Sequence, residues 1–249
     1  AHGIQAFPTQ PTWSLSGVLG PTTDSANVGD SVLIDRVLSL AFSPDGTLLA
    51  TGGGEASRSG QIVLWNLSDA SVARELSEPH SDTVYGMEFS FDGTLLLSGA
   101  ADKFAKVFNV ASGEFVRSYE GHTHHVMDVS WKADGTSLAT AGADNAIKIW
   151  NFETGEQQRT IGGYSKQVTA LSYVGQGDTL LSSSADQTVQ YHTSGNGKTT
   201  RNFGGLSDYI YTVAGTPDGS LVAAGAEDGT LKVWNGNDGK EIASFAPAE

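Results

Sequence analysis

Four aspartates recur along the chain at a constant spacing, and carboxylates repeated in this way could surround a metal ion. Asp102, Asp144, Asp186 and Asp228 lie 42 residues apart, and carboxylate oxygens are preferred ligands of calcium. A step of this length puts each aspartate in a different structural unit, so a shared ion would need a channel lined by all of them. We therefore expect these residues to form turns and not a metal centre.

Two other patterns resemble ligand sites only in part. His124 and His125 are adjacent, so on a strand their side chains would point to opposite faces. Zinc would need three or four convergent ligands in a chain that has no Cys. The glycine run at 52–54 resembles a phosphate-binding loop, but no Gly-Lys-Ser/Thr sequence follows it. The sequence predicts neither a metal nor a cofactor.

The residue pattern gives little support to catalysis. No Gly-x-Ser-x-Gly motif is present, and no two carboxylates can be given separate acid and base roles. The lack of Cys excludes disulfides, thiolate metal sites, a Cys nucleophile and covalent attachment of c-type haem. The chain carries 28 acidic and 14 basic residues, a net charge of −14, which repels nucleic-acid phosphates and anionic lipid headgroups. We expect no enzyme, no nucleic-acid partner and no membrane insertion.

The elements that position these residues follow the same step. Two further columns keep it without drift: Phe108, Trp150, His192 and Trp234, and His80, His122, Tyr164 and Leu206. Five copies are visible, at about residues 37–76, 84–119, 126–161, 168–203 and 210–246. The sequence predicts one repeat domain over 12–249, preceded by an N-terminal extension at 1–11.

Each copy has the pattern of four short strands. In the third copy these are 126–132, 136–141, 146–151 and 156–161. Turn residues such as Asp134-Gly135 separate them, because Asp tolerates the tight bend and Gly adopts positive φ without a steric cost. No helix-length amphipathic stretch intervenes, so neighbouring strands must pair antiparallel. The fold class is all-β.

The second strand of each copy indicates how the copies pack. Residues 95–100 and 221–225 lack a polar face, so they need cover on both sides. A four-stranded unit that cannot bury itself alone, stacked radially on its copies, is the blade of a β-propeller. A segment at 13–19 resembles the last strand of a copy without its other strands. The five blades either belong to a larger ring, such as a seven-bladed one, or form a compact five-bladed ring with a spare strand.

Gly121-His122, Asp144 and Trp150-Asn151 are similar to the Gly-His, turn aspartate and Trp-Asp positions of WD-repeat β-propellers. The resemblance covers about residues 12–246. It implies a buried hydrogen-bonded set in each blade, made of His, Ser or Thr, Asp and Trp. The residues so assigned are His122, Thr140, Asp144 and Trp150 in the third copy, His80, Ser98 and Asp102 in the second, Tyr164, Ser182, Asp186 and His192 in the fourth, and Asp228 and Trp234 in the fifth. Phe108 replaces Trp in the second copy, and Leu206 and Ala224 break the set in the fifth.

Function is expected in the variable loops, because binding sites lie in loops that a rigid scaffold positions. The loops between second and third strands, and those between blades, vary most. We hypothesise a recognition patch made of Glu55, Arg58, Asp82, Lys103, His124, His125 and Lys166. The favoured function is a non-catalytic protein-interaction scaffold, a module of a larger protein. Its partner would be another protein or another domain of the same polypeptide, with self-association if the ring is incomplete. The alternative is a metal-dependent hydrolase or lyase with its site at the mouth of the central channel.

A finer resemblance rests on Asp35–Gly46, on the run from Ala50 to Trp65, on Ala101–Phe104 and on Gly121–Val126. These segments are similar to bacterial multidomain proteins in which a WD-repeat region accompanies a c-type cytochrome domain. The resemblance implies a periplasmic location and a redox partner. The chain has no Cys-x-x-Cys-His motif, so the haem itself would lie elsewhere.

Overall fold

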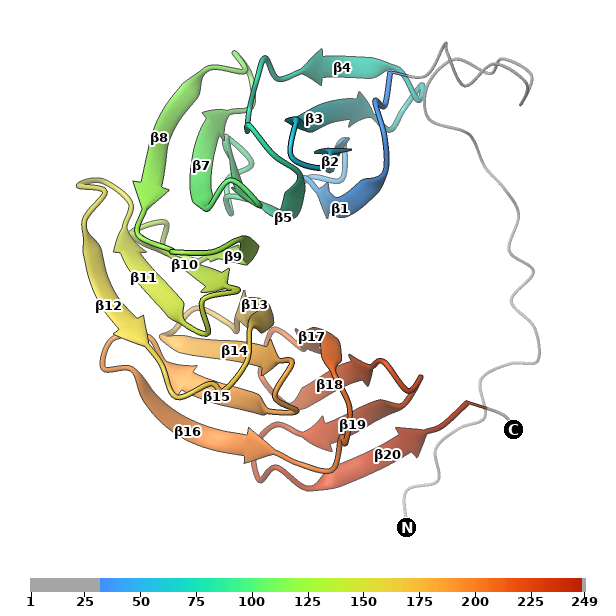
Figure 1. Cartoon of the computed structure of the whole chain (residues 1–249), viewed down its shortest axis with the longest axis vertical. Helices are drawn as coiled ribbons and strands as arrows, with labels where there is room; N and C mark the ends of the chain where they lie inside the picture. Colours follow the sequence, from blue (N-terminus) through green and yellow to red (C-terminus); the bar gives the residue numbers. More distant parts are fainter. Residues whose placement is uncertain (1–31, 248–249) are drawn as a thin grey trace.

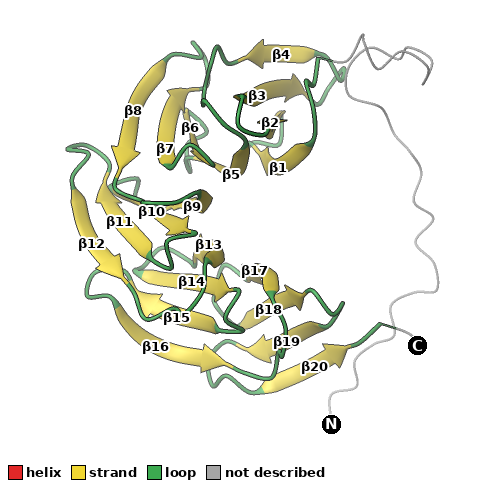
Figure 2. Cartoon of the chain, in the orientation of Figure 1, coloured by secondary structure: helices red, strands yellow, loops and turns green. Residues whose placement is uncertain are grey.

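The structure is a computed structural model that describes residues 32–247, and these residues form five four-stranded antiparallel sheets without a helix (Figures 1 and 2). The first blade contains β1 (Val37–Phe42), β2 (Leu48–Glu55), β3 (Ser59–Asn66) and β4 (Val72–Glu75), and the second contains β5 (Val84–Phe89), β6 (Leu95–Ala100), β7 (Phe104–Asn109) and β8 (Phe115–Glu120). The third contains β9 (Val126–Trp131), β10 (Ser137–Gly142), β11 (Ile147–Asn151) and β12 (Gln157–Ile161). The fourth contains β13 (Val168–Tyr173), β14 (Thr179–Ser184), β15 (Val189–Thr193) and β16 (Lys198–Phe203), and the fifth contains β17 (Ile210–Gly215), β18 (Leu221–Ala226), β19 (Leu231–Asn235) and β20 (Glu241–Phe245). The all-β prediction is confirmed.

The Asp-Gly turns close the first hairpin of four of the blades, and each aspartate accepts a hydrogen bond from the backbone N–H two residues on. In the first blade, Oδ1 of Asp45 accepts from the Ser43 hydroxyl at 2.6 Å and from the Thr47 N–H at 3.0 Å. Gly46 has φ of 69°, a left-handed conformation that costs glycine nothing. Asp92, Asp134 and Asp218 accept from the backbone N–H two residues on in the same way. Short-range chemistry therefore fixes this end of these blades.

The blades pack side by side through their first strands, which lie nearest the centre of the molecule (Figure 1). Strand β1 contacts β5, β5 contacts β9, β9 contacts β13, and β13 contacts β17. Each of the four junctions buries an apolar cluster contributed by two neighbouring sheets. The second strands are covered on both sides, so β6, β10 and β14 are buried from their second residue onward.

The five blades form an open arc, with β1–β4 at one end and β17–β20 at the other (Figure 1). The described residues therefore do not close into a five-bladed ring. The fifth blade has one face packed on the fourth blade and one face bare. Leu231 is 42% exposed, whereas Val189, 42 residues earlier, is 1% exposed; Phe245 is 57% exposed and the corresponding Phe203 is 2% exposed.

The first blade differs, because part of its outward face is covered, although Leu38, Leu40 and Phe42 on β1 are exposed. Trp65 is buried, and Val32 and Leu33 pack against it. The side chain of Gln61 ties this segment to β3, since its amide group donates to the Val32 carbonyl at 2.7 Å and its Oε1 accepts from the Ile34 N–H at 2.9 Å. The predicted strand at 13–19 and the predicted extension at 1–11 lie outside the described residues.

Candidate binding surface on the loop face

The β2–β3 hairpin and the β4–β5 loop meet at one end of the first blade. Arg58 forms an ion pair with Glu55 within the hairpin. The backbone N–H of Ser57 donates to Oδ1 of Asp82 at 2.7 Å, which joins the hairpin to the loop that leads into the second blade. The Arg58 side chain is 74% exposed. The hairpin is thus held in place while its guanidinium stays accessible.

His124 and His125 lie on the next loop around the arc, between β8 and β9. The ring of His125 stacks on Tyr85 with centroids 5.9 Å apart, and the ring of His124 lies 4.3 Å from that of His125. Burial lowers the pKa of His125, His124 and Lys103 lower it further, and Asp82 opposes them. Asp82, Lys103 and His124 therefore lie close enough to His125 to interact with it electrostatically.

Six of the seven predicted patch residues are therefore connected across the first three blades: Glu55, Arg58, Asp82, Lys103, His124 and His125. Lys166 lies further along the arc on the loop between β12 and β13 and is exposed. Its backbone carbonyl accepts a hydrogen bond from the Ser184 hydroxyl at 3.3 Å. Within residues 32–247, the interactions that connect the other six do not include Lys166.

The third blade contains a buried hydrogen-bonded set that supports this loop. Nδ1 of His122 donates to Oδ1 of Asp144 at 2.8 Å, and Nε2 accepts from the Thr140 hydroxyl at 2.7 Å. The Trp150 indole N–H donates to the same hydroxyl oxygen at 2.9 Å. Burial lowers the pKa of His122 although Asp144 opposes the shift, so the imidazole is neutral near pH 7.

The second blade repeats this arrangement without an indole. Nδ1 of His80 donates to Asp102 at 2.9 Å, and Nε2 accepts from Ser98 at 2.8 Å. Phe108 occupies the tryptophan column and has no N–H to offer. Asp102 also accepts from the Ser81 N–H at 3.1 Å, so the carboxylate holds the loop that carries Asp82.

In the fourth blade the hydroxyl of Tyr164 takes the place of the imidazole. It lies 2.8 Å from the Ser182 hydroxyl and 2.7 Å from Nε2 of His192. Asp186 was expected in this set but bonds none of the three residues; it accepts from the Ser165 N–H at 2.8 Å and the Thr188 hydroxyl at 2.6 Å.

The fifth blade has no such set. The Trp234 indole donates to the Gly204 carbonyl at 3.0 Å, and Asp228 accepts from the Thr230 N–H at 2.8 Å. The first blade keeps one pair that the sequence analysis did not name, since the Trp65 indole donates to Thr51 at 2.9 Å.

A family model described as "WD domain, G-beta repeat" matches residues 33–66, 73–109, 113–151, 155–192 and 197–235. These matches cover most of the chain. The chain belongs to the WD40 repeat family. Each WD40 match after the first begins at or near the fourth strand of one blade and ends in or directly after the third strand of the next. Each sequence repeat therefore includes strands of two adjacent blades. The folding of a repeat thus depends on the packing of these two blades against each other.

Curated WD40 relatives are similar over about a third of this chain. WD repeat-containing protein 1 of Xenopus tropicalis is 35% identical over 82 residues, which are 32% of this chain and 13% of the relative. The WD repeat-containing protein 91 homolog of Dictyostelium discoideum is 29% identical over 41% of this chain and 13% of its own length. The intraflagellar transport protein 122 homolog of Xenopus tropicalis is 35% identical over 28% of this chain and 6% of its own length. The matched region is thus a small part of each of these longer proteins.

Two acidic residues on the inner strands were missed by the sequence analysis. Glu88 on β5 accepts from the Trp131 N–H of the next blade, and Asp128 on β9 accepts from the Leu171 N–H at 2.9 Å. Burial raises the pKa of each carboxyl to about 7. The sequence contained a signal for Glu88. The positions 42 and 84 residues after it are Ser130 and Ser172, so the second copy has an acidic residue where the third and fourth copies have a small one.

No three His, Asp or Glu side chains within residues 32–247 are grouped so that they could hold a metal ion. No helix in the same range has the length and apolar character needed to cross a lipid bilayer.

Proposed function

We propose that this WD40 chain is a protein-interaction scaffold whose loop face over the first three blades binds a polypeptide. The observation that supports the proposal is that the hairpin carrying Arg58 is hydrogen-bonded to Asp82, and that Asp82 interacts electrostatically with His125. Buried carboxylates hold the loops that carry Asp82 and His125. Asp102 and Asp144 each accept from both a buried imidazole and a loop N–H. A rigid surface loses little conformational entropy when it binds, which favours recognition.

The surface has the mixed character of a protein-binding site. It presents an exposed guanidinium, an exposed lysine, two imidazoles and the stacked ring of Tyr85. Arg and Tyr are enriched among residues that dominate binding energy at interfaces. The net charge of −14 disfavours phosphate backbones as partners. These groups can bind a polypeptide, which would come from another protein or from another domain of the same chain.

Affinity capture with four forms of the chain tests the proposal. Wild type and Lys240→Ala are expected to retain the same partner, because Lys240 is exposed on the opposite set of loops, between β19 and β20. Arg58→Ala/His124→Ala is expected to lose it. Lys166→Ala shows whether the patch extends beyond the six connected residues. Unchanged retention by the double variant would contradict the proposal.

Two finer predictions concern contacts of this chain with other copies of itself and with other domains. Self-association has a candidate surface in the bare face of the fifth blade, where Leu231 and Phe245 are exposed. Attachment to a bacterial cytochrome domain stays a prediction, and the relatives described above are eukaryotic. For the metal-dependent hydrolase or lyase, the described residues supply no observation in its favour.

A further inference from the structure

An open pocket of about 570 Å³ lies at the centre of the arc, at the end of the strands where the Asp-Gly turns lie. Residues from the inner part of all five blades line it, among them Phe42, Glu88, Trp131, Tyr173 and Thr216. This end is opposite to the loop face, because β5 begins after the loop that carries Asp82 and ends before the turn at Asp92. The pocket is therefore separate from the proposed recognition patch.

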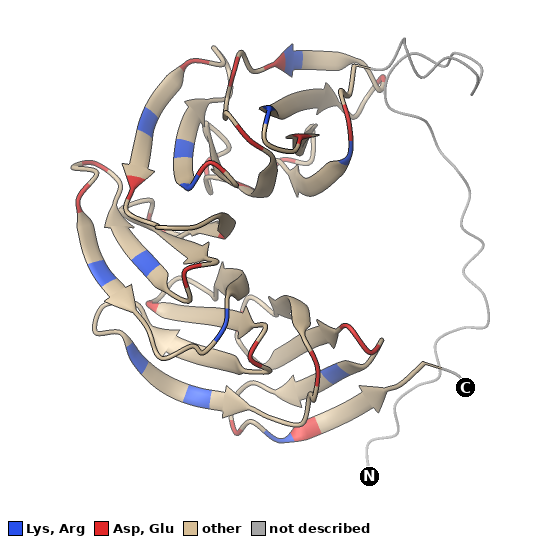
Figure 3. Ribbon diagram, in the orientation of Figure 1, with Lys and Arg blue, Asp and Glu red and all other residues tan. Residues whose placement is uncertain are grey.

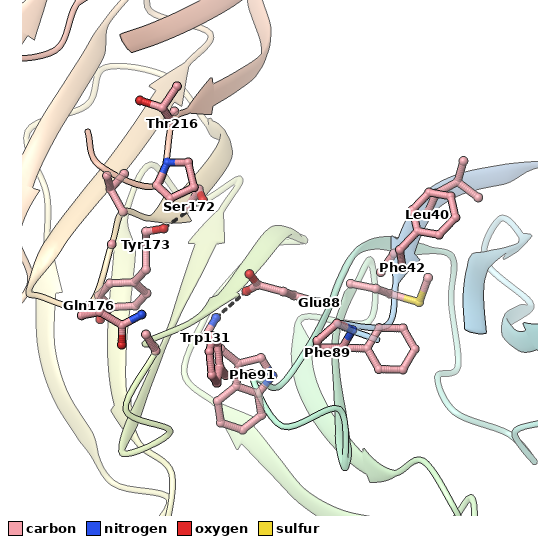
Figure 4. Close-up of a pocket in the computed structure, with 18 residues that line it drawn as sticks. Leu40, Phe42, Glu88, Phe89, Phe91, Trp131, Ser172, Tyr173, Gln176 and Thr216 are labelled. Carbon is pink, nitrogen blue, oxygen red and sulfur yellow. Dashed lines mark hydrogen bonds between the residues drawn. The ribbon is translucent and has the colours of Figure 1, made fainter. Parts of the chain in front are cut away.

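Glu88 supplies the one carboxylate in the lining of this pocket. Figure 4 shows its side chain between Tyr173 and Gln176 on one side and Phe42 and Leu40 on the other. The carboxylate accepts hydrogen bonds from the Trp131 N–H and the Ser130 hydroxyl. Both donors are neutral, so they stabilise the carboxylate without balancing its charge.

No cation balances Glu88 within the described residues. The pocket lining contains no Lys, Arg or His, and the inner strands β1, β5, β9, β13 and β17 contain none either. Figure 3 shows Lys and Arg on other strands, including β4, β8, β12 and β16. Lys132, which follows β9, is held at 2.9 Å by both Asp134 and Asp178. A desolvated carboxylate without a counter-charge is costly, and buried charges in proteins are normally paired.

Aromatic side chains surround the same space. Phe89 and Trp131 in this lining are buried, whereas Phe42, on β1 at the open end of the arc, and Phe91 are exposed, Phe91 by 71%. Large apolar side chains left in contact with water around a concave site indicate binding. Aromatic faces attract ammonium and guanidinium groups through the ring quadrupole.

We propose that this pocket binds an organic cation, with its ammonium or guanidinium group on the Glu88 carboxylate and its apolar stem against Phe42 and Phe91. The cation supplies the counter-charge that the fold omits. Its source is either a free small amine or guanidine, or a Lys or Arg side chain of a polypeptide. This inference is independent of the loop-face function, since it uses none of the patch residues.

Ionisation of Glu88 makes the binding depend on pH. Burial raises the pKa of Glu88 to about 7, so the cation must displace a proton near neutrality. The titratable group that interacts with it is Asp128 on β9, whose pKa burial also raises to about 7. Burial also raises the pKa of Tyr173 on β13, but the charged groups that act on its hydroxyl are Lys132, Asp178 and Asp134. Strand β1 contributes none. Affinity should increase about tenfold from pH 6 to pH 8, as Glu88 passes from mostly protonated to mostly ionised.

Calorimetric titration with three probes tests the proposal: ethylguanidinium, the blocked tripeptide acetyl-Gly-Arg-Gly-amide, and its citrulline counterpart. Wild type is expected to bind the two cations and not the neutral citrulline peptide. Stronger binding of ethylguanidinium identifies a small-molecule source, and stronger binding of the arginine peptide identifies a polypeptide source. Glu88→Gln should weaken cation binding about ten- to a hundredfold. Glu156→Gln, which removes one acid from an exposed turn, should leave it unchanged.

A second variant keeps the binding test valid if the first does not fold. If circular dichroism shows that Glu88→Gln fails to fold, Phe91→Leu replaces it, because Phe91 is largely exposed and its loss should still weaken cation binding several-fold. Equal binding of the citrulline peptide, unchanged cation binding by Glu88→Gln, or no binding by wild type would each overturn the proposal. Loss of the partner from the loop face has no bearing on these titrations, so the two proposals fail separately.

Discussion

His122 and Asp144 are joined by a hydrogen bond of 2.8 Å between Nδ1 and Oδ1, and the second carboxylate oxygen accepts from the Thr123 N–H at 3.0 Å. One carboxylate thus connects the buried centre of the third blade to the loop that carries His124 and His125. This relationship links the stability of the blade to the geometry of the proposed recognition patch.

Asp144→Ala should lower the free energy of unfolding by about 2–4 kcal/mol, because it leaves His122 and the Thr123 N–H without their acceptor. Chemical denaturation measures the change. Asp228→Ala is the matched control, since Asp228 accepts from its own turn at Thr230 and belongs to no set. A melting temperature of Asp144→Ala within about one degree of wild type would refute this role for Asp144.

Two tryptophans in the third blade allow the stability contributed by an indole hydrogen bond to be measured separately from the stability contributed by the size of the ring. Trp150 Nε1 donates to Thr140 at 2.9 Å, whereas Trp131 Nε1 is buried and has no hydrogen-bond partner within residues 32–247. Both rings are almost fully buried. Trp150→Phe should therefore cost about 1–2 kcal/mol more than Trp131→Phe. Equal losses in denaturation experiments would show that the Trp150 hydrogen bond adds nothing.

Glu88 should make the protein less stable as pH rises. Its pKa is about 7 when folded and 4.5 as the ordinary value, so the folded state binds the extra proton between these two pH values. The stabilisation that this proton contributes is complete below pH 4.5 and is lost as pH rises through 7. Denaturation of wild type and Glu88→Gln at several pH values should show the variant gaining about 3 kcal/mol relative to wild type between pH 4.5 and pH 8. Titrating groups that do not interact with Glu88 cancel in this difference, whereas Asp128 interacts with Glu88 and contributes to it. A constant difference would contradict the prediction.

The bare face of the fifth blade should cause concentration-dependent self-association. Leu231→Lys/Phe245→Lys is expected to reduce it, because both side chains are exposed on that face and charges there oppose apolar contact. Val116→Lys on β8 controls for charge added to an exposed apolar position elsewhere. Sedimentation velocity measures the association, and a wild type that is monomeric at all concentrations would refute the prediction.

The fold could be predicted well because its determinants are local and repeat. Asp134-Gly135 closes a hairpin through bonds to Thr136, two positions after the aspartate. The column of Phe108, Trp150 and Trp234 marks the third strand of the second, third and fifth blades. The candidate patch could be predicted only as a set of loops. Lys166 occupies a loop equivalent to that of His124, yet it lies apart from the residues around His125.

The sequence by itself determined the four-stranded repeat, its turns and its apolar faces, because each depends on neighbouring residues and on a constant spacing. The tertiary structure alone decided that the described blades form an open arc, since the angle between blades comes from side-chain packing at every junction. It also decided that Glu88 faces a central pocket without a counter-charge. Burial and the sum of surrounding charges are properties of all five blades together, and no single repeat encodes them.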